Sequence, residues 1–561
     1  MRKEIISILI LSIATFFIIT GGKILNPNFI DWLILNKEQI SDNEMHLLGW
    51  LFFKETPFFQ FPLLLIPNLG EGLNISLVYT DSIPLMAILF KILKNFLSDN
   101  FQYFGIWTYI CFILQGIFSY LILSKFINDR NNKILATLLF LLAPTFLFRF
   151  QLGHFALLGH WIILASILLY CTNRFDYKKW LLVIIASLLI HPYLFGMVLG
   201  IFLADVLQNL IKNTHQYKII IIKLLLVAAV TTSSLFVLGH IDLNSINNLE
   251  LYGGYGHFKM NLLSIVDPAY NLLGKEISWS RLFPDMPNQD WRKTFADYEG
   301  FNYLGIALIT LIILVSFKIK QFKLDIKSRT GISFFLPLII ISFLLFIFSI
   351  SNNITAGGNL LFHYILPEKL IEPFNVFRAS GRFFWPVYYL LYFFIIILFT
   401  RCYKTKHATL ILVVIVSLQV FDTFPSLKDI NQRLNKESSS TYWSSKLKNS
   451  FWSNLPERYT KITYVFPFNQ PTKSFELLYF ASKNNLSTNF GYWFKDTKYF
   501  YSKEKKRLQN QILMNEFEDY SIYYFHDLDA WTNIINNKGP QDYAKEVDGY
   551  KIYAPNFFSE K

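Results

Sequence analysis

Three titratable side chains lie close together near the N-terminus, in the segment SDNEMHLLGW at residues 41–50. Asp42 and His46 are four residues apart and would share one face of a helix. Because a partly dry setting raises the pKa of a carboxyl group toward neutrality, Asp42 is a candidate general base at a membrane surface, with His46 as its companion. The alternative is structural, since Ser41 or Asp42 would also serve as the N-cap of a following helix.

Three further candidates for substrate binding lie next to apolar segments. Asp81, in YTDSIP, is a second candidate carboxylate, or the cap of a helix with Pro84 in its first turn. His154 lies at the end of an apolar run, and it points away from His160 on a helix, so the two do not form a metal pair on one face. The alternative to substrate binding is that both are interfacial histidines. Glu299, in DYEGFNYLG, is suited to bind a sugar hydroxyl or a metal, or to cap the helix that follows.

Two arginines, Arg378 and Arg382, occur in the segment FRASGRFFWP just before an apolar run. Basic residues are disfavoured in the outer loops of membrane proteins, so this pair calls for an anionic partner such as a lipid phosphate or pyrophosphate. On a helix the two side chains would form a clamp. The alternative is anchoring at the membrane interface among aromatic residues, and snorkelling is the corresponding alternative for Arg149.

The elements that position these residues follow from composition. The chain has 561 residues, of which 53% are hydrophobic and only 16% charged, whereas soluble proteins carry about a quarter charged residues. The apolar blocks are long enough to cross roughly 30 Å of hydrocarbon, which predicts an α-helical polytopic membrane protein. We place eleven transmembrane helices at 5–20, 101–126, 134–150, 155–171, 180–193, 194–211, 219–240, 301–317, 331–350, 383–400 and 407–420.

Loop charges predict the orientation. The formal net charge of +13 lies mostly in short loops, which indicates membrane topology and not nucleic-acid binding. Residues 23–81 hold seven acids against three bases, and residues 241–299 hold eight against five. The positive-inside rule then predicts a cytoplasmic N-terminus. The net basic, cytoplasmic loops are 125–133, 174–179, 212–218, 318–329 and 401–406.

Two apolar segments need separate interpretation. His191-Pro192 interrupts residues 180–211, and loop charge favours a hairpin of two spans there over a single long span. Residues 83–97 contain Lys91 and Lys94 and are too short to span, so they predict an interfacial helix that lies on the membrane.

The predicted domains are a transmembrane domain, 1–423, and an extracytoplasmic α/β domain, 424–561. The first has long external loops at 23–82, 241–299 and 351–382. The second is polar, without a Gly-rich phosphate loop, a Ser-His-Asp signature or a CxxC pair, so we expect it to support a site and not to contain one. Its predicted strands are 462–466, 520–525 and 550–553, and its predicted helices are 475–482 and 503–517.

This order of features resembles the C-type (GT-C fold) glycosyltransferases, integral membrane enzymes that use polyprenyl-phosphate-linked sugars. The segments DNEMHLLGWLFF, YTDSIPL, HFALLGHW, EGFNYLGIAL and FRASGRFFWP are also similar to those of an uncharacterised bacterial membrane-protein family with that fold. The resemblance implies that an acid of the first external loop, here Asp42, acts as base or metal ligand. It also implies that Arg378 or Arg382 holds the donor phosphate. The first loop has no DxD or ExD pair, so a divalent metal cofactor stays unassigned.

The expected function is therefore transfer of a sugar from a polyprenyl-phosphate donor to an extracytoplasmic glycan or lipid acceptor of the cell envelope. The expected location is the bacterial inner (cytoplasmic) membrane, and the expected partners are the polyprenyl-phosphate-sugar lipid and membrane lipids. The alternative is a non-enzymatic lipid or glycan transporter, or a flippase-like protein. We find no internal repeat, and the spans are nearly free of acids apart from Asp205, which favours chemistry at the surface over a transmembrane path.

Overall fold

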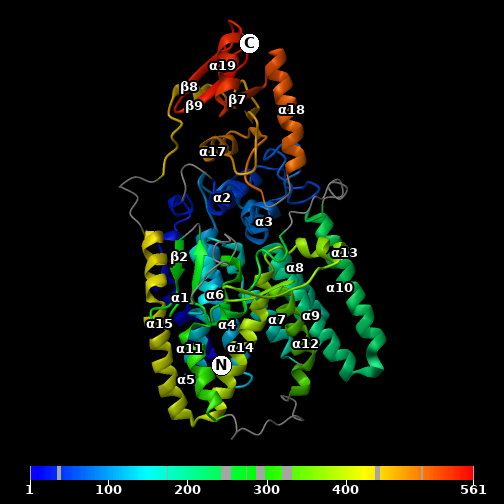
Figure 1. Ribbon diagram of the computed structural model, residues 1–561, viewed down its shortest axis with the longest axis vertical. Helices are drawn as coiled ribbons and strands as arrows, with labels where there is room; N and C mark the ends of the chain where they lie inside the picture. Colours follow the sequence, from blue (N-terminus) through cyan, green and yellow to red (C-terminus); the bar gives the residue numbers. More distant parts are fainter. Residues whose placement is uncertain are drawn as a thin grey trace. The chain divides into compact units, whose positions relative to one another are not determined.

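The computed structural model of the chain describes residues 2–34, 40–172, 175–241, 254–272, 275–285, 297–318, 332–435, 443–493 and 497–559. The chain forms two compact units, each assembled from separate stretches of sequence (Figure 1). The bundle unit comprises Met1–Leu25, Phe104–Thr232 and Leu251–Lys436. The sheet unit comprises Asn26–Tyr103, Ser233–Glu250 and Glu437–Lys561.

The bundle unit consists mainly of long apolar helices, and α10 continues from it into the sheet unit. These helices are α1 (Arg2–Thr20), α4 (Phe104–Leu123), α5 (Arg130–Leu141), α6 (Pro144–Leu152), α7 (Trp161–Tyr170), α8 (Tyr177–Ile190), α9 (Pro192–Lys212), α10 (Tyr217–Val237), α11 (Gly305–Ser316), α12 (Ile332–Ile350), α14 (Trp385–Cys402) and α15 (Thr405–Asn435).

Each of the eleven predicted spans overlaps at least one of these helices. Among the described residues, seven helical segments are long and apolar enough to cross a membrane, and three apolar helices are shorter. The chain is thus mostly helical with several candidate membrane-spanning helices, whereas the number eleven stays a prediction. The seven segments are Arg2–Thr20, Phe104–Leu123, Arg130–Leu152, Pro192–Lys212, Tyr217–Val237, Ser380–Cys402 and Thr405–Asn435.

The predicted break in residues 180–211 is present as two packed helices, of which Pro192–Lys212 is long and apolar enough to span, whereas two membrane crossings here stay a prediction. Helix α8 ends at Ile190, and Pro192 begins α9, where the missing N–H of proline costs no helical hydrogen bond. The Nδ1 atom of His191 caps α9 by accepting the Tyr193 N–H at 3.1 Å. The two helices then pack against each other.

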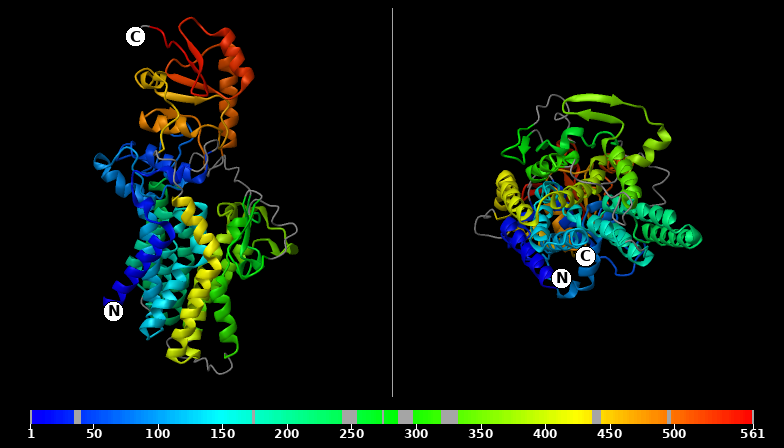
Figure 2. Two further views of the ribbon diagram at one scale, coloured as in Figure 1. Left: turned by 90° about the vertical axis from the view of Figure 1, so that its left-hand side faces the viewer. Right: turned by 90° about the horizontal axis from the view of Figure 1, so that it is seen from below.

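Helix packing in the bundle unit places α4 against α1, α5 and α7, and α9 against α7, α8 and α12 (Figures 1 and 2). Gly116 on α4 allows close approach to α1, because a Cβ atom there would lie 2.1 Å from the Ser12 hydroxyl. Large apolar side chains such as Ile222 on α10 and Phe343 on α12 point outward. A lipid environment accommodates such apolar outer faces.

Short elements connect these helices and carry most of the residues discussed below. They are η5 (Ala156–Leu158), η8 (Leu262–Ile265), β1 (Ala269–Leu272), β2 (Lys275–Ser278), η10 (Asp297–Gly300), β3 (Asn353–Ala356), β4 (Asn359–His363), α13 (Glu368–Asn375) and η12 (Ser380–Phe384). The β1–β2 and β3–β4 pairs are antiparallel hairpins.

The C-terminal part of the sheet unit is a mixed α/β fold, as predicted. Its five-stranded sheet has the order β6-β5-β7-β9-β8, in which β5 is parallel to β6 and β7, and β9 is antiparallel to β7 and β8. All five predicted strands and helices are confirmed, as β5, β7, β9, α17 and α18. The elements are α16 (Ser450–Asn454), β5 (Lys461–Tyr464), α17 (Phe475–Lys483), β6 (Ser487–Thr488), α18 (Lys498–Met514), β7 (Ser521–Phe525), α19 (Leu528–Asn537), β8 (Tyr543–Val547) and β9 (Tyr550–Ala554).

Most of the first loop belongs to the same compact unit as this sheet. Within the sheet unit, residues 26–103 contain η2 (Asp31–Leu33), α2 (Asp42–Phe53), η3 (Leu77–Thr80), α3 (Pro84–Ile92) and η4 (Lys94–Phe96), whereas η1 (Lys23–Leu25), at the start of the loop, belongs to the bundle unit. Leu69 forms a parallel bridge with Thr488 of β6, and the Glu71 N–H donates to the Thr488 carbonyl at 2.6 Å. Helix α2 packs on α17. The loop therefore extends the edge of the sheet.

Candidate functional site

Three charged side chains from distant parts of the sequence meet inside the bundle unit. Glu299, in η10, accepts a hydrogen bond from Nη1 of Arg149 at 2.8 Å and from Nε of Arg382 at 2.6 Å. A second bond from Arg382, to the other carboxylate oxygen, makes that pair bidentate. The Arg149 side chain is fully buried and Glu299 is 4% exposed. The cluster therefore carries one excess positive charge in a largely dry setting.

Aromatic rings surround both guanidinium groups. The Arg149 guanidinium carbon lies 5.0 Å from the ring centroids of Phe148 and Trp385, and that of Arg382 lies 4.6 Å from the ring of Tyr193. Ring faces attract cations and exclude water at the same time. Complete burial of Arg149 excludes the snorkelling interpretation of this residue.

Glu299 stays ionised in this environment. Burial would raise the pKa of its carboxyl group, but the charges of Arg382 and Arg149 outweigh that effect and hold the pKa well below its ordinary value. Both carboxylate oxygens accept hydrogen bonds from arginine. The arrangement thus suits a fixed counter-ion and not a group that exchanges protons at neutral pH.

Two glycines bring the chain segments of the cluster together. A Cβ atom on Gly300 would lie 2.2 Å from the Lys259 carbonyl oxygen, and one on Gly381 would lie 2.9 Å from the Gly300 Cα. The Asn302 side-chain amide joins these segments by donating to the carbonyls of Gly300 and Gly381 at 3.1 and 3.2 Å. Only glycine permits this backbone contact, so the two positions fix Glu299 and Arg382 beside each other.

His154 and Arg378, the other two predicted residues of the bundle unit, have different surroundings. His154 is half-buried, and its Nδ1 lies 3.3 Å from Nη1 of Arg149. Arg378 is also half-buried, with its guanidinium 5.4 Å from the Phe258 ring. Arg378 precedes η12 and does not share a helix with Arg382, so the predicted helical clamp is wrong. The chain between α13 and η12 turns at this point, which a spacing of four residues does not reveal.

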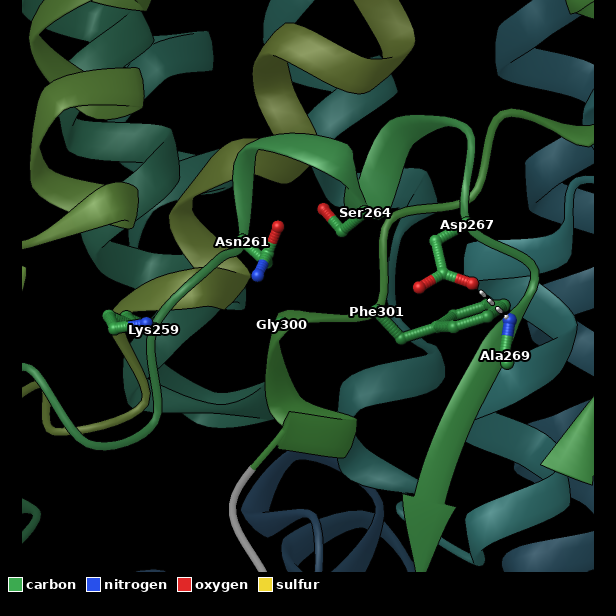
Figure 3. A pocket seen from close by; sticks show the side chains of 7 residues that line it. All are labelled: Lys259, Asn261, Ser264, Asp267, Ala269, Gly300 and Phe301. Atoms are coloured by element: carbon green, nitrogen blue, oxygen red, sulfur yellow. Dashed lines mark hydrogen bonds between the residues drawn. The ribbon is translucent and has the colours of Figure 1, made fainter. Parts of the chain in front are cut away.

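A small polar pocket lies next to the cluster, and sequence reasoning did not single out its residues. Lys259 and Asp267 lie on opposite sides of this pocket, with Asn261 and Ser264 between them (Figure 3). Its free space of about 10 Å³ is enough for about one water molecule. The Ser264 hydroxyl is buried and has no hydrogen-bond partner among the described residues. The excess of acids in residues 241–299 was the only sequence signal of polar chemistry in this region.

The candidates of the first loop belong to the sheet unit. Ser41 is the N-cap of α2, and the Glu44 carboxylate accepts the Ser41 N–H at 3.0 Å, which forms a capping box. His46 is buried, with its Nδ1 2.9 Å from the Thr80 carbonyl oxygen. Asp42 is half-exposed in the first turn of α2. The structural interpretation thus holds for Ser41 and Glu44, while Asp42 stays a candidate base.

Asp81 lies in the same unit, at the end of η3, with φ = 51°. The N-cap position of α3 is Ile83 and not Asp81, and Pro84 lies in the first turn as expected. Across the part of the chain that the structure describes, no three His, Cys, Asp or Glu side chains gather where they would hold a metal ion.

These features define a mostly helical protein with several candidate membrane spans, a buried arginine–glutamate–arginine cluster and a C-terminal mixed α/β fold. The chain belongs to the DUF6311 family, a domain of unknown function: the family model matches residues 9–424, and the model of the DUF6311 C-terminal domain matches residues 451–555. No curated protein matches the chain. The family match confirms the similarity to an uncharacterised membrane-protein family, and the likeness to C-type glycosyltransferases stays a proposal.

Proposed function

We propose that this protein is a membrane glycosyltransferase that transfers a sugar from a polyprenyl-phosphate donor to an extracytoplasmic glycan or lipid acceptor. In this proposal eleven helices span the bacterial cytoplasmic membrane, the N-terminus is cytoplasmic, and the long loops and the C-terminal domain are extracytoplasmic. The charge pattern of the loops and the order of the elements support it.

The observation that carries the proposal is the excess positive charge of the arginine–glutamate–arginine cluster. Glu299 neutralises one of two guanidinium groups, and neither Nη1 of Arg382 nor the buried Nε of Arg149 donates to another described residue. Guanidinium groups are suited to phosphate oxygens. The phosphodiester of a polyprenyl-phosphate sugar carries one negative charge, which would balance the cluster.

The same charge favours catalysis over simple binding. As the sugar leaves, the phosphodiester becomes a phosphate monoester with more negative charge. A fixed cationic site therefore binds the transition state and the departing phosphate more tightly than the donor. We assign this stabilisation to Arg382, and the second positive charge to Arg149, which shares the Glu299 carboxylate with it. His154 and Arg378 are proposed as further hydrogen-bond donors to the substrate.

The proposed reaction moves one proton and one electron pair and balances without a cofactor. Asp42 accepts the proton of the acceptor hydroxyl, and the acceptor oxygen forms a bond to the anomeric carbon with inversion. The bond from that carbon to the phosphate oxygen breaks, and its electron pair stays on the polyprenyl phosphate. We assign His46 a positioning role through its contact with the Thr80 carbonyl, and Asp81 a role in binding the substrate.

Mass spectrometry of lipid-linked sugars and surface glycans tests the proposal in a deletion strain complemented with variants. We expect Asp42→Asn and Arg382→Gln to accumulate the donor lipid and to lack the transferred sugar, as the deletion does. Asp529→Asn, at an exposed position on α19, is the control that restores transfer. Full transfer by Asp42→Asn at normal protein level would disprove the role of the base.

The alternative function, transport of a lipid or glycan, gives a different result in the same strains. If the protein is a flippase, its inactive variants would change the distribution of the lipid-linked sugar between the two leaflets. Purified enzyme would then show no new glycosidic bond with any donor. Transfer by purified protein in detergent, where no leaflets exist, excludes that alternative.

A further inference from the structure

The sheet unit contains a basic cleft that the proposed function does not use. The cleft offers about 390 Å³ of space and opens between the end of α2, the segment after it and α3. Lys91, near the end of α3, and Lys94, in η4, both line it. The other lining residues are Glu55, Thr56, Pro57, Phe58, Pro67, Asn68 and Asn485.

Lys91 is the unusual member of this set, because its side chain is buried without a counter-ion. Its ammonium donates to the Thr56 hydroxyl at 2.6 Å and to the Pro57 carbonyl at 3.1 Å, and it lies 4.0 Å from the Phe53 ring centroid. Of the carboxylates that the structure describes, none lies within salt-bridge distance of it. A buried charge that has hydrogen bonds but no counter-ion is a favourable place for an anion.

The charges around the cleft also favour a bound anion. Burial, and then the nearby charge of Lys94, lower the pKa of Lys91 to about 8, and Glu55 opposes this effect. Glu55 is shared with Lys94, whose ammonium lies 3.7 Å from its carboxylate, and with Lys54 at 3.9 Å. Asp99 also acts on Lys54 and on the nearby Lys483, so two carboxylates face four lysines and the region keeps an excess of positive charge. A bound anion would relieve the repulsion and return the pKa of Lys91 toward its ordinary value.

Exposed apolar side chains flank the cleft on two segments. Phe59 is 89% exposed and Phe96 is 88% exposed, and Phe61 is also exposed. On α3 and just after it, Leu89, Ile92 and Leu93 are exposed as well. Large exposed rings beside lysines are typical of a surface that lies in the interface of a bilayer, which agrees with the interfacial helix predicted for residues 83–97.

We propose that this cleft binds the phosphate of an anionic glycerophospholipid at the bilayer surface, with Lys91 and Lys94 contacting the phosphate oxygens. The amides of Asn68 and Asn485, which hydrogen-bond to each other at 2.8 Å, face the rest of the headgroup. The exposed rings around Phe59 and Phe96 lie among the acyl chains. Because these rings occupy two separate segments, they match a bilayer surface better than the single chain of one bound lipid. The inference does not rest on the proposed glycosyl transfer.

Native mass spectrometry of the delipidated full-length protein tests this site with three probes: phosphatidylglycerol, polyprenyl phosphate and inorganic phosphate. We expect phosphatidylglycerol to bind, and Lys91→Gln/Lys94→Gln to weaken this binding roughly tenfold or more. The matched control is Lys503→Gln/Lys506→Gln, which removes two exposed lysines with the same spacing from α18. This control should bind phosphatidylglycerol like the wild type.

Three outcomes would overturn the proposal. Equal binding of phosphatidylglycerol by the lysine variant and the wild type is one. A second is that the lysine variant loses binding of polyprenyl phosphate only, since the cleft would then bind the sugar-donor lipid. Saturation by inorganic phosphate alone is the third. If the double variant does not fold, Lys94→Gln replaces it, because the Lys94 side chain is 39% exposed and its substitution leaves the core intact.

Discussion

Glu299 accepts hydrogen bonds from two arginines that come from distant helices and loops, and it supplies the only carboxylate in direct contact with them among the described residues. Burial of three charges is costly, and the mutual attraction of the charges compensates only while all three are present. The contribution of Glu299 to stability is therefore best measured with glutamine, which removes the negative charge and keeps the size of the side chain.

Glu299→Gln should lower the stability of the folded protein by about 3–5 kcal/mol, because it leaves two buried guanidinium groups without a counter-ion. Thermal unfolding in detergent measures this change. Glu372→Gln, at an exposed position on α13, is the control and should unfold like the wild type. Equal stability of both variants would show that the cluster is not held by its charge.

The depressed pKa of Glu299 predicts a dependence on pH. A carboxyl group whose pKa is lower in the folded than in the unfolded state contributes stability above its ordinary pKa of 4.5, and this contribution is lost as the pH falls below that value. The difference in unfolding temperature between wild type and Glu299→Gln should thus be largest near pH 7 and narrow progressively below pH 4.5. A difference that stays constant down to pH 3 would contradict the assigned pKa.

Asp42 and Glu44 differ in role although they are two residues apart. Glu44→Ala removes half of the capping box of α2 and should cost about 1 kcal/mol of stability. Asp42→Asn keeps the cap and should change stability by less, through the helix dipole alone, while it abolishes transfer. Unfolding and transfer measured on both variants separate the two roles, and the reverse pattern would refute the assignment.

At the scale of elements, the site depends on how closely three loop segments approach. Gly300 and Gly381 permit this approach, so the geometry of the cluster depends on positions that carry no functional group. A substitution at one of these glycines would therefore change the positions of the charged side chains and leave the charged groups themselves in place.

Gly300→Ala should disrupt the cluster, because its Cβ would meet the backbone oxygen of Lys259 at 2.2 Å. We expect lower protein yield and loss of transfer. Gly200→Ala on α9 is the matched control, since a Cβ there meets only side-chain atoms at 3.4 Å or more, and alanine favours a helix. Normal yield and transfer by Gly300→Ala would mean that the segments can separate without harm.

The sequence predicts the helices well, because long apolar blocks, and breaks such as His191-Pro192, are local signals. It also indicates His154, Glu299 and Arg382 as polar residues at the ends of apolar runs. It does not indicate that these three meet, or that Arg149 is fully buried between them, since no local pattern encodes contacts between distant segments. The pocket residues Lys259 and Asp267 were missed for the same reason.

At the scale of the whole molecule, the family match covers the apolar part and the C-terminal domain as separate regions, whereas the sheet unit joins the first loop to the C-terminal domain. The bridge between Leu69 and Thr488 and the ion pair between Glu71 and Lys461, at 2.9 Å, connect them. A β-strand edge without its neighbour loses paired backbone groups and buried area. The two regions should therefore stabilise each other.

Deletion of Glu437–Lys561 should make the first loop susceptible to proteolysis, because α2 loses its contact with α17 and residues 68–71 lose their backbone partners. Limited proteolysis in detergent, read by mass spectrometry, should place the new cleavage sites in residues 26–103. Glu71→Gln is the control: it removes only the ion pair with Lys461, in which the carboxylate is half-exposed, worth up to about 1 kcal/mol, and should leave the cleavage pattern unchanged. Resistance of the first loop in the truncated protein equal to that in the full chain would mean that this loop folds without the sheet.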